Sequence, residues 1–422
     1  MGGLVKVYKS VLVVADDFTG ANDTILQFAK QGLRSISTLN LDSLKKYLNE
    51  YKAVAVSTES RADEPSTAYR KLYEVGLKVK EYKDLLLYKK VDSTLRGNIR
   101  EEVKGLYDAV KPDLVVFAPA YPKQGRVTVN GVHLVNETPV DKTIFAKDPR
   151  APVKSSNLRW YFEKVFGDLY THVYLNELRS GKFLEKLGVY TLLSFDVEND
   201  FDLIAIARSL VNYSGKILWV GSAGLAEVLA YSAIIGNTRG RPTLLIVGSL
   251  NDVTKNQLNN YLKVFRCRLI KISIKDMVKY FDKEYNRVVE QAAEALRLGE
   301  DIAIATSYDQ SQIDEGYALS SELGVEMDRV SDLIAKEFGR IMAKLILELG
   351  SKSFSGVFVA GGDTAIALVK SLGIDSLEVI GEVEPGIPIL KCGDLIMVTK
   401  AGGFGEELTI VKIVTRIKGA SI

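Results

Sequence analysis

The chain is poor in the residues that most metal and redox sites require. Its 422 residues include only two cysteines, Cys267 and Cys392, and two histidines, His133 and His172. Two cysteines cannot form a disulfide framework or a four-cysteine zinc site. Two histidines so far apart cannot form the HExxH zinc motif. A Ser–His–Asp triad, a dithiol redox motif and a structural zinc site are therefore all disfavoured.

The sequence also lacks a strong net charge and a long apolar run. Fifty-five Lys and Arg residues against 53 Asp and Glu residues leave a formal charge of +2, which argues against a polyanion as partner. No apolar stretch approaches the roughly 18–20 residues that span a bilayer, and the run at 11–15 is too short for a signal peptide. We therefore expect a cytoplasmic protein with no nucleic acid or membrane partner. A homo-oligomer is left open.

Short apolar, β-branched runs alternate with longer helical patterns along most of the chain, which predicts βαβ units and mostly parallel sheets. Before residue 238 the predicted strands are 11–15, 54–57, 85–89, 114–118, 192–197 and 217–220. After residue 242 they are 244–247, 269–274, 302–305, 357–360 and 396–399.

A β-hairpin interrupts this alternation. Segments 126–129 and 132–135 flank Asn130-Gly131, the usual type I′ turn, and His133 is expected to be an ordinary polar position within the hairpin. The polar stretch 236–242 is the best domain boundary, because it contains glycine and proline between a helix and a new strand. The sequence thus predicts an α/β protein with two domains, 1–238 and 243–422. Each is expected to be a mostly parallel sheet flanked by helices, with the hairpin inserted in the N-terminal domain.

Three predicted strands of the C-terminal domain end in glycine turns, at Gly248, Gly361 and Gly402. Ligands of open α/β sheets bind at the carboxyl ends of the strands. Glycine lets backbone N–H groups approach a ligand there, and a helix N-terminus behind the turn favours anions. Three such turns predict a phosphate cradle. Neither GxxxxGK[ST] nor GxGxxG occurs, so a dinucleotide oxidoreductase is less favoured than another kind of nucleotide site.

Polar side chains cluster at strand ends of the N-terminal domain as well. Asp16 and Asp17 end the first strand, where an acidic pair can bind Mg²⁺, orient hydroxyls or act as a base. Segment 89–98 supplies the Lys, Ser, Thr, Arg and Asn donors that a carboxylate-bearing polyol needs, and Arg61 follows the neighbouring strand. Helix capping, turn formation and ordinary surface exposure are the alternative explanations for these residues.

Two of these segments carry a family resemblance. The sequence ADDFTGA at 15–21, followed by KKVDSTLRGN at 89–98, resembles the four-carbon acid sugar kinases. Shorter matches follow in the same order at 221–226, 248–249, 361–364 and 402–405, so the resemblance covers nearly the whole chain. One departure is Leu250-Asn251, where many relatives carry small or Cys-containing residues. Members of this family phosphorylate acids such as D-threonate, D-erythronate or 3-oxotetronates with ATP.

The resemblance implies an N-terminal domain that binds the acid sugar and a C-terminal domain that binds ATP, with Mg²⁺ at the phosphates. No metal-ligating residue is assigned. The implied substrate residues are Asp16, Asp17, Arg61, Lys90, Asp92, Ser93, Thr94 and Arg96. The implied ATP residues are Ser249, Gly361, Gly362, Asp363, Thr364, Gly402 and Gly403.

The implied reaction needs mainly positioning and charge stabilisation, in a cleft between the two domains. An acidic residue on the acceptor side, Asp17 or Asp92, is the expected general base, and Arg61 or Lys90 is expected to bind the substrate carboxylate. Two other functions remain open. A sugar-acid or nucleotide sensor would bind the same ligands without turnover. A nicotinamide-dependent sugar-acid dehydrogenase would need a dinucleotide fingerprint, which is not found.

Overall fold

The computed structural model describes residues 8–237 and 241–420, and the chain forms two compact units. The first unit is Met1–Asn237 and the second is Thr238–Ile422. The boundary stretch expected from the sequence, 236–242, includes residues 238–240, which lie outside the described part of the chain. Each unit has its own sheets and its own hydrophobic core, as a separate domain requires.

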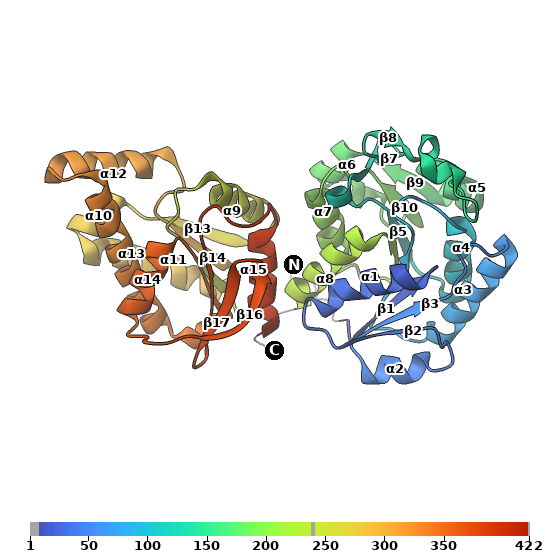
Figure 1. Ribbon diagram of the computed structural model, residues 1–422, viewed down its shortest axis with the longest axis horizontal. Coiled ribbons are helices and arrows are strands. Elements are labelled where there is room, and N and C mark those ends of the chain that lie inside the picture. Colours follow the sequence, from blue (N-terminus) through green and yellow to red (C-terminus); the bar gives the residue numbers. More distant parts are fainter. Residues whose placement is uncertain (1–7, 238–240, 421–422) are drawn as a thin grey trace. The chain divides into compact units, whose positions relative to one another are not determined.

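The first unit is built on an eight-stranded sheet with the strand order β2-β3-β1-β4-β11-β5-β10-β9 (Figure 1). All neighbouring strands run parallel. Because β1 lies between β3 and β4, the segments that follow these three strands meet at one edge of the sheet. The strands are β1 (Ser10–Ala15), β2 (Ser35–Thr38), β3 (Ala53–Ser57), β4 (Leu85–Lys90), β5 (Leu114–Ala118), β9 (Tyr170–Val173), β10 (Leu192–Phe195) and β11 (Ile217–Gly221).

Helices cover both faces of this sheet, so its central strands are buried along their whole length. On one face α2 to α5 pack on the hydrophobic core, and on the other α1 packs against α8, and α8 against α7. The helices are α1 (Phe18–Ala29), α2 (Leu44–Glu50), α3 (Pro65–Val79), α4 (Ile99–Val110), α5 (Leu158–Phe166), α6 (Leu175–Ser180), α7 (Asp200–Leu210) and α8 (Ala223–Asn237).

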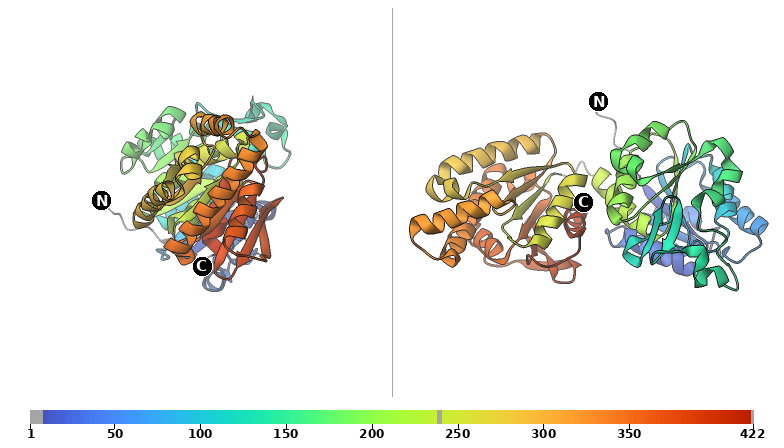
Figure 2. Two further views of the ribbon diagram at one scale, coloured as in Figure 1. Left: turned by 90° about the vertical axis from the view of Figure 1, so that its left-hand side faces the viewer. Right: turned by 90° about the horizontal axis from the view of Figure 1, so that it is seen from above.

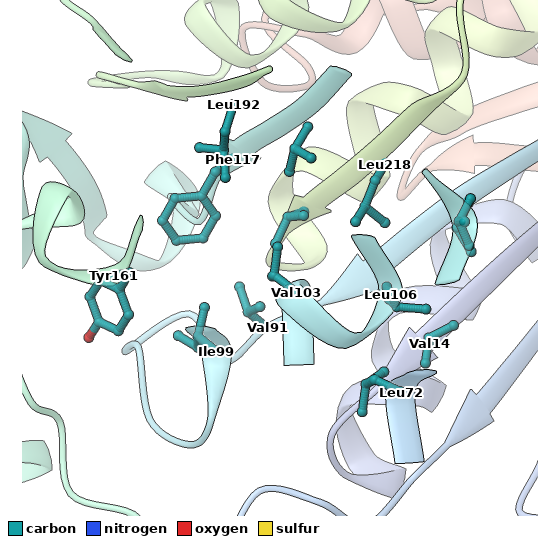
Figure 3. Close-up of a cluster of buried hydrophobic side chains, with 14 of the residues drawn as sticks. Val14, Leu72, Val91, Ile99, Val103, Leu106, Phe117, Tyr161, Leu192 and Leu218 are labelled. Atoms are coloured by element: carbon teal, nitrogen blue, oxygen red, sulfur yellow. The ribbon is translucent and has the colours of Figure 1, made fainter. Parts of the chain in front are cut away.

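The core of the first unit shows how the sequence pattern places a helix. In α4 the apolar residues recur every three or four positions and so form one buried face. Val103 and Leu106 of that face are fully buried, which contributes roughly 1.5–3 kcal/mol each. Figure 3 shows them among core side chains from the strands and the neighbouring helices, including Val14, Leu72, Val91, Ile99, Phe117, Tyr161, Leu192 and Leu218.

The predicted hairpin is confirmed as an insertion between β5 and α5. It forms a separate antiparallel sheet of β6 (Arg126–Val129), β7 (Val132–Val135) and β8 (Thr138–Pro139). Asn130 and Gly131 have φ angles of 52° and 75°, as a type I′ turn requires. Their N–H groups donate to the carboxylate of Asp196 at 3.0 and 2.8 Å, and His172 Nε2 lies 3.0 Å from the same carboxylate. The turn is thereby anchored beside the end of β10.

The second unit is built on a seven-stranded sheet with the order β13-β14-β12-β15-β18-β17-β16. Its first five strands run parallel, and β17 and β16 add an antiparallel edge. The ends of β12, β15 and β18 are therefore neighbours at the carboxyl edge. The strands are β12 (Thr243–Val247), β13 (Cys267–Lys271), β14 (Asp301–Ala305), β15 (Gly356–Ala360), β16 (Glu378–Glu384), β17 (Ile387–Cys392) and β18 (Leu395–Lys400).

Helices again lie on both sides of the sheet, as the further views show (Figure 2). The side chains of α10, α11, α13 and α14 form the larger core with the sheet, and α9 packs against α15. The helices are α9 (Asp252–Val264), α10 (Ile274–Lys279), α11 (Phe281–Arg297), α12 (Gln310–Leu323), α13 (Met327–Leu349), α14 (Gly362–Ser371) and α15 (Thr409–Ala420).

These units confirm the predicted α/β class with two mostly parallel, helix-flanked sheets. None of the helices in the described part of the chain is long and apolar enough to cross a membrane.

Candidate functional site

Three segments that the sequence singled out meet at the carboxyl edge of the first unit. They follow β1, β3 and β4, and hydrogen bonds tie them together. The N–H of Ser60 donates to the carbonyl of Asp16 at 2.9 Å, and the side-chain amide of Asn98 donates to the carbonyl of Ser60 at 3.0 Å. Residues 16–17, 58–61 and 90–98 therefore form one polar cluster, which holds all eight expected substrate residues.

Arg61 joins the two aspartates of this cluster. Its guanidinium donates to both oxygens of Asp16, from Nε at 2.6 Å and from Nη2 at 3.1 Å, and Nη1 donates to Asp17 Oδ2 at 2.8 Å. The side chain of Asp16 is 2% exposed and that of Asp17 is 26% exposed. Asp17 also caps α1 by accepting from the N–H of Gly20 at 2.9 Å. Asp17 is therefore the member of the acidic pair that solvent and a ligand can reach.

Three cations keep Asp16 ionised at the base of the cluster. Burial alone would raise the pKa of this carboxyl, but Lys89, Arg61 and Lys90 together hold it below its ordinary value. A carboxylate that is buried, charged and bound by a bidentate guanidinium is a fixed part of the structure. Asp16 therefore orients Arg61 and is a poor acceptor for a substrate proton.

Lys90 differs from the other charged residues of the cluster. It is only 5% exposed, yet its ammonium has no hydrogen bond or ion pair within the described residues. The ammonium lies over the first turn of α1, where a Cβ placed on Gly20 would come within 2.9 Å of Nζ. Its charge acts on the carboxylate of Asp16 without a direct contact, so the three N–H donors of the buried ammonium are left without acceptors among the described residues, which is costly. Lys90 thus places a buried ammonium with unused donors beside the acidic pair.

Asp92 and Arg96 form a second, closed pair in the loop after β4. Arg96 donates to Asp92 from Nε at 2.7 Å and from Nη2 at 3.1 Å, and the hydroxyl of Thr94 also donates to this carboxylate. Burial alone would raise the pKa of Asp92, but Arg96 and Arg61 hold it well below its usual range. Both oxygens of Asp92 are thus engaged in shaping the loop. Arg96 also donates to Asp148 at 3.1 Å, which ties the loop to segment 136–158.

His133 is not the ordinary hairpin position that the sequence suggested. It is fully buried, and its Nε2 lies 2.9 Å from the carbonyl oxygen of Ser93, while Nδ1 lies 3.0 Å from the hydroxyl of Thr128. A carbonyl can only accept, so the ring donates from Nε2 and accepts at Nδ1. Burial lowers the pKa of His133 to about 4, so the ring is neutral at pH 7. The inserted hairpin thus positions the loop that carries Asp92, Ser93 and Thr94.

A buried ion pair beneath the cluster was missed by the sequence interpretation. Lys89 Nζ lies 2.9 Å from Glu102 Oε2 and donates to the carbonyl of Lys90 at 2.6 Å. Glu102 also accepts from the hydroxyl of Ser60 at 2.5 Å. This pair links β4, α4 and the loop after β3. Glu102 carried no local signal, because it lies inside a helix and its partner comes from another element.

The second unit contains a cavity of about 550 Å³ at its carboxyl edge. One side consists of the turns that follow β12, β15 and β18. All seven expected ATP residues line it: Ser249, Gly361, Gly362, Asp363, Thr364, Gly402 and Gly403.

The three turns touch one another. A Cβ on Gly248 would come within 2.0 Å of Thr364 Oγ1, and a Cβ on Gly402 within 2.3 Å of Ser249 Oγ. Gly362 differs, because a Cβ there would meet no atom within 4 Å. Glycine at 248 and 402 lets the turns pack together, whereas Gly362 opens onto the cavity at the first residue of α14.

The other side of the cavity was not predicted, and most of it is formed by α12 and α13. Apolar side chains dominate, among them Ile313, Tyr317, Met327 and Ile334. Thr306 and Ser307 also line the cavity and follow β14, so the strand-end rule that identified the other turns could have found them. The helical residues carry no such signal, because their apolar pattern also fits a core-facing helix.

No group of three or more His, Cys, Asp or Glu side chains suited to a metal ion occurs in residues 8–237 and 241–420. Among the acidic residues that the structure describes, Asp363 alone lines the cavity. Mg²⁺ that arrives on a nucleotide keeps several waters and needs only one or two carboxylates. The residues present therefore fit a metal that is held mainly by phosphate, and they do not form a metal site of their own.

Comparisons with known proteins match both units. Residues 11–229 match the family described as "Sugar-binding N-terminal domain", and residues 244–410 match "Nucleotide-binding C-terminal domain". A D-threonate kinase of Salmonella typhimurium is 32% identical over 418 residues, covering 95% of this chain and 96% of its own. A D-erythronate kinase of Heliobacterium modesticaldum is 26% identical, covering 96% of this chain and 93% of its own.

A solved structure has the same fold. A protein from Bordetella bronchiseptica, crystallised with bound citrate as a domain-swapped dimer, is 25% identical and has a TM-score of 0.68. The match covers 97% of this chain and 98% of the other. The two matched domains and a relative that is 32% identical along nearly its whole length show the family. The chain belongs to the four-carbon acid sugar kinases.

Proposed function

We propose that this chain is an ATP-dependent kinase that phosphorylates a hydroxyl of a four-carbon sugar acid of the threonate, erythronate or 3-oxotetronate class. The first unit would bind the acid and the second the nucleotide. The observation that carries the proposal is the cavity of the second unit, which joins three glycine turns to an apolar wall. Its volume lies within the roughly 300–1,000 Å³ of small-molecule sites. The relatives named as kinases support the same reaction class.

The two sides of the cavity suit the two ends of ATP. The N–H groups of Gly248 and Gly361 are bonded to the carbonyls of Ala360 and Lys400. The donors for phosphate are therefore those of Gly402 and Gly403, which have no partner among the described residues, together with the N-terminus of α14, which begins at Gly362. The apolar wall near Tyr317 and Ile334 suits a purine base. Asp363 would provide the protein's carboxylate to Mg²⁺. When bound, the metal neutralises the charge on the bridging phosphate oxygens.

The polar cluster of the first unit suits a carboxylate with several hydroxyls. Lys90 supplies an ammonium that no protein group satisfies among the described residues, and Arg61 retains two N–H groups beyond the three that bind Asp16 and Asp17. We assign the substrate carboxylate to Lys90, with Arg61 as a second donor. Asp17 would accept from the hydroxyl that reacts, whereas Asp92, together with Ser93 and Thr94, would hold the remaining hydroxyls.

Catalysis would consist mainly of positioning. The acid and the nucleotide are assigned to different units, so transfer requires the γ-phosphate and the acceptor hydroxyl to meet, and we propose that they do so in a cleft between the units. Exclusion of water there would limit wasteful ATP hydrolysis. Asp17 would take the proton as the hydroxyl oxygen attacks the γ-phosphorus, and the bond from that phosphorus to the oxygen shared with the β-phosphate would break to release ADP. The need for ATP favours the cytoplasm as the compartment.

A coupled ADP-release assay tests this function. Purified full-length chain is given ATP and Mg²⁺ with a panel of D- and L-threonates, erythronates and 3-oxotetronates. We expect ADP release that depends on one of these acids. Binding of ATP and an acid without ADP release would instead indicate a sensor. Absence of ATP binding by calorimetry would overturn the proposal. Light scattering on the same sample tests whether the chain is a homo-oligomer, as the dimeric Bordetella relative suggests.

A further inference from the structure

Lys400 is a buried lysine with an unusual set of partners. It is the last residue of β18, directly before the turn with Gly402 and Gly403, and it is 2% exposed. Its ammonium has no ion pair among the residues of the second unit that are described. Instead it lies 2.8 Å from the hydroxyl of Thr254 and 3.1 Å from each of three carbonyl oxygens, those of Ala401, Gly402 and Phe404.

Other donors beneath the turn point to the same carbonyl groups. Thr254 donates its hydroxyl to the carbonyl of Gly402 at 2.7 Å. Gln257, one turn further along α9, donates its amide to the carbonyls of Phe404 at 3.1 Å and Glu406 at 2.8 Å. The carbonyl oxygens of Ala401, Gly402, Phe404 and Glu406 are therefore gathered on the inner side of the turn.

The N–H groups of the turn differ from its carbonyl groups in their hydrogen bonding. Those of Gly402 and Gly403 have no hydrogen-bond partner in the part of the second unit that is described, and both residues line the cavity. Lys400 itself does not belong to the lining. The side chain thus lies behind the turn, while the unsatisfied donors lie on the side that a ligand can reach.

A cation explains this arrangement better than a neutral side chain would. Three carbonyl dipoles that converge on one point repel one another, and an ammonium with three donors removes that repulsion. The arrangement is costly, because burial lowers the pKa of Lys400 to about 8. Glu384 is the charged group that acts on it, from β16, which is separated from β18 by β17, and Glu384 is itself bound by Lys412 and Thr409. A lysine kept in this environment without its own carboxylate is poorly explained by stability alone.

We propose that Lys400 is a positioning residue of the nucleotide site. Its ammonium holds the carbonyl groups of the turn from behind and thereby directs the N–H groups of Gly402 and Gly403 toward the phosphates of ATP. This inference rests on the proposed nucleotide-binding function of the second unit. It adds a residue that touches no substrate and that acts through the backbone of the turn.

The test compares Lys400→Met with Lys418→Met in the full-length chain. Lys418 is a second buried lysine of the same unit, but it pairs with Asp301 at 2.9 Å and, among the described residues, makes no hydrogen bond to the turn. We expect Lys400→Met to weaken ATP binding, measured by calorimetry with Mg²⁺, by tenfold or more, with the acid KM little changed. Lys418→Met should lose thermal stability and keep its ATP affinity.

A pH profile separates positioning from simple structural support. In the wild type, ATP affinity should fall as pH rises through about 8, because Lys400 then loses its charge. The Met variant should lack this step. If Lys400→Met does not fold, Thr254→Val replaces it, since this change removes the hydroxyl that joins Lys400 to Gly402, and a several-fold loss of affinity is expected.

Two results would overturn the inference. One is wild-type ATP affinity in a folded Lys400→Met or Thr254→Val chain. The other is a wild-type profile that is flat between pH 7 and 9.5. Failure of the wild type to bind ATP at any pH would instead contradict the proposed function, so the two failures can be distinguished.

Discussion

Arg61 Nε lies 2.6 Å from Asp16 Oδ2, and the same guanidinium reaches Asp17 at 2.8 Å. One cation thus holds the two successive carboxylates that follow β1. This relationship changes the role expected for Arg61 from sequence alone. Most of its binding capacity is directed at the protein, so its first task is to fix the acidic pair.

Arg61→Ala should raise the KM for the acid by roughly one to two orders of magnitude, because the carboxylate of Asp16 loses its bidentate partner and the substrate loses a donor. The KM for ATP should change little. Steady-state kinetics of Arg61→Lys provides the comparison, since lysine keeps the charge but cannot bind both aspartates in the same way. A folded Ala variant with the wild-type KM for the acid would remove Arg61 from the site.

Lys90→Met separates ligand binding from stability. Lys90 makes no hydrogen bond or ion pair in the described residues and acts on Asp16 only at longer range, so its replacement should change thermal stability little while the acid KM rises about tenfold or more. The adjacent Lys89→Met is the matched control, because Lys89 is paired with the buried Glu102. Breaking such a pair costs about 3–5 kcal/mol. If Lys90→Met keeps the wild-type acid KM, the substrate carboxylate binds elsewhere.

The sequence predicted the site best where the chemistry follows a strand directly. The turns after β1, β4, β12, β15 and β18 were all identified, because parallel strands place their carboxyl ends together and glycine or aspartate marks the turn. The hairpin at Asn130-Gly131 was correct for a similar reason, since its turn type requires positive φ at both residues.

Elements that depend on distant packing were harder to predict. A strand was expected at 269–274, but β13 ends at Lys271, and Ser273 caps α10 by accepting from the N–H of Asp276 at 3.2 Å. The edge strands β2 and β16 lack a long apolar run. Glu102 and Tyr317 belong to the candidate sites only because other elements pack beside them. No local pattern records such contacts.

Gly362→Val should raise the KM for ATP by about tenfold or more without a loss of thermal stability. A Cβ at this position meets no protein atom within 4 Å, so a larger side chain occupies only the space assigned to phosphate. Gly248→Val serves as the contrast. Its Cβ would come within 2.0 Å of Thr364 Oγ1, so this variant should lose stability as well. ATP binding of wild-type strength in Gly362→Val would place the phosphates away from this turn.

His133 should make the free energy of unfolding depend on pH. Its pKa is lowered to about 4 in the folded chain, while an unfolded histidine titrates near 6.5. As pH falls from about 6.5 to 4, the unfolded chain gains a proton that the folded chain does not, so the wild type should lose about 3 kcal/mol from this group. Urea unfolding of wild type and His133→Gln at pH 7 and pH 4.5 measures it. The difference in unfolding free energy between wild type and His133→Gln should be smaller at pH 4.5 than at pH 7. An equal difference at both pH values would contradict a buried, neutral His133.

Asp17→Asn tests the general base. Asparagine keeps the size of the side chain and an oxygen that can cap α1 at Gly20, so the fold should survive, but the group can no longer take a proton. If Asp17 is the base, kcat should fall by about 10²–10⁴ while ATP affinity stays intact.

Asp92→Asn is the matched control. The side chain of Asp92 is less exposed than that of Asp17, 11% against 26%, and Arg96 binds it through both oxygens, so its loss should raise the acid KM and lower stability more than it lowers kcat. The reverse result, a small effect on kcat at Asp17 and a large one at Asp92, would transfer the base to the loop after β4 and leave Asp17 as a helix cap that orients Arg61.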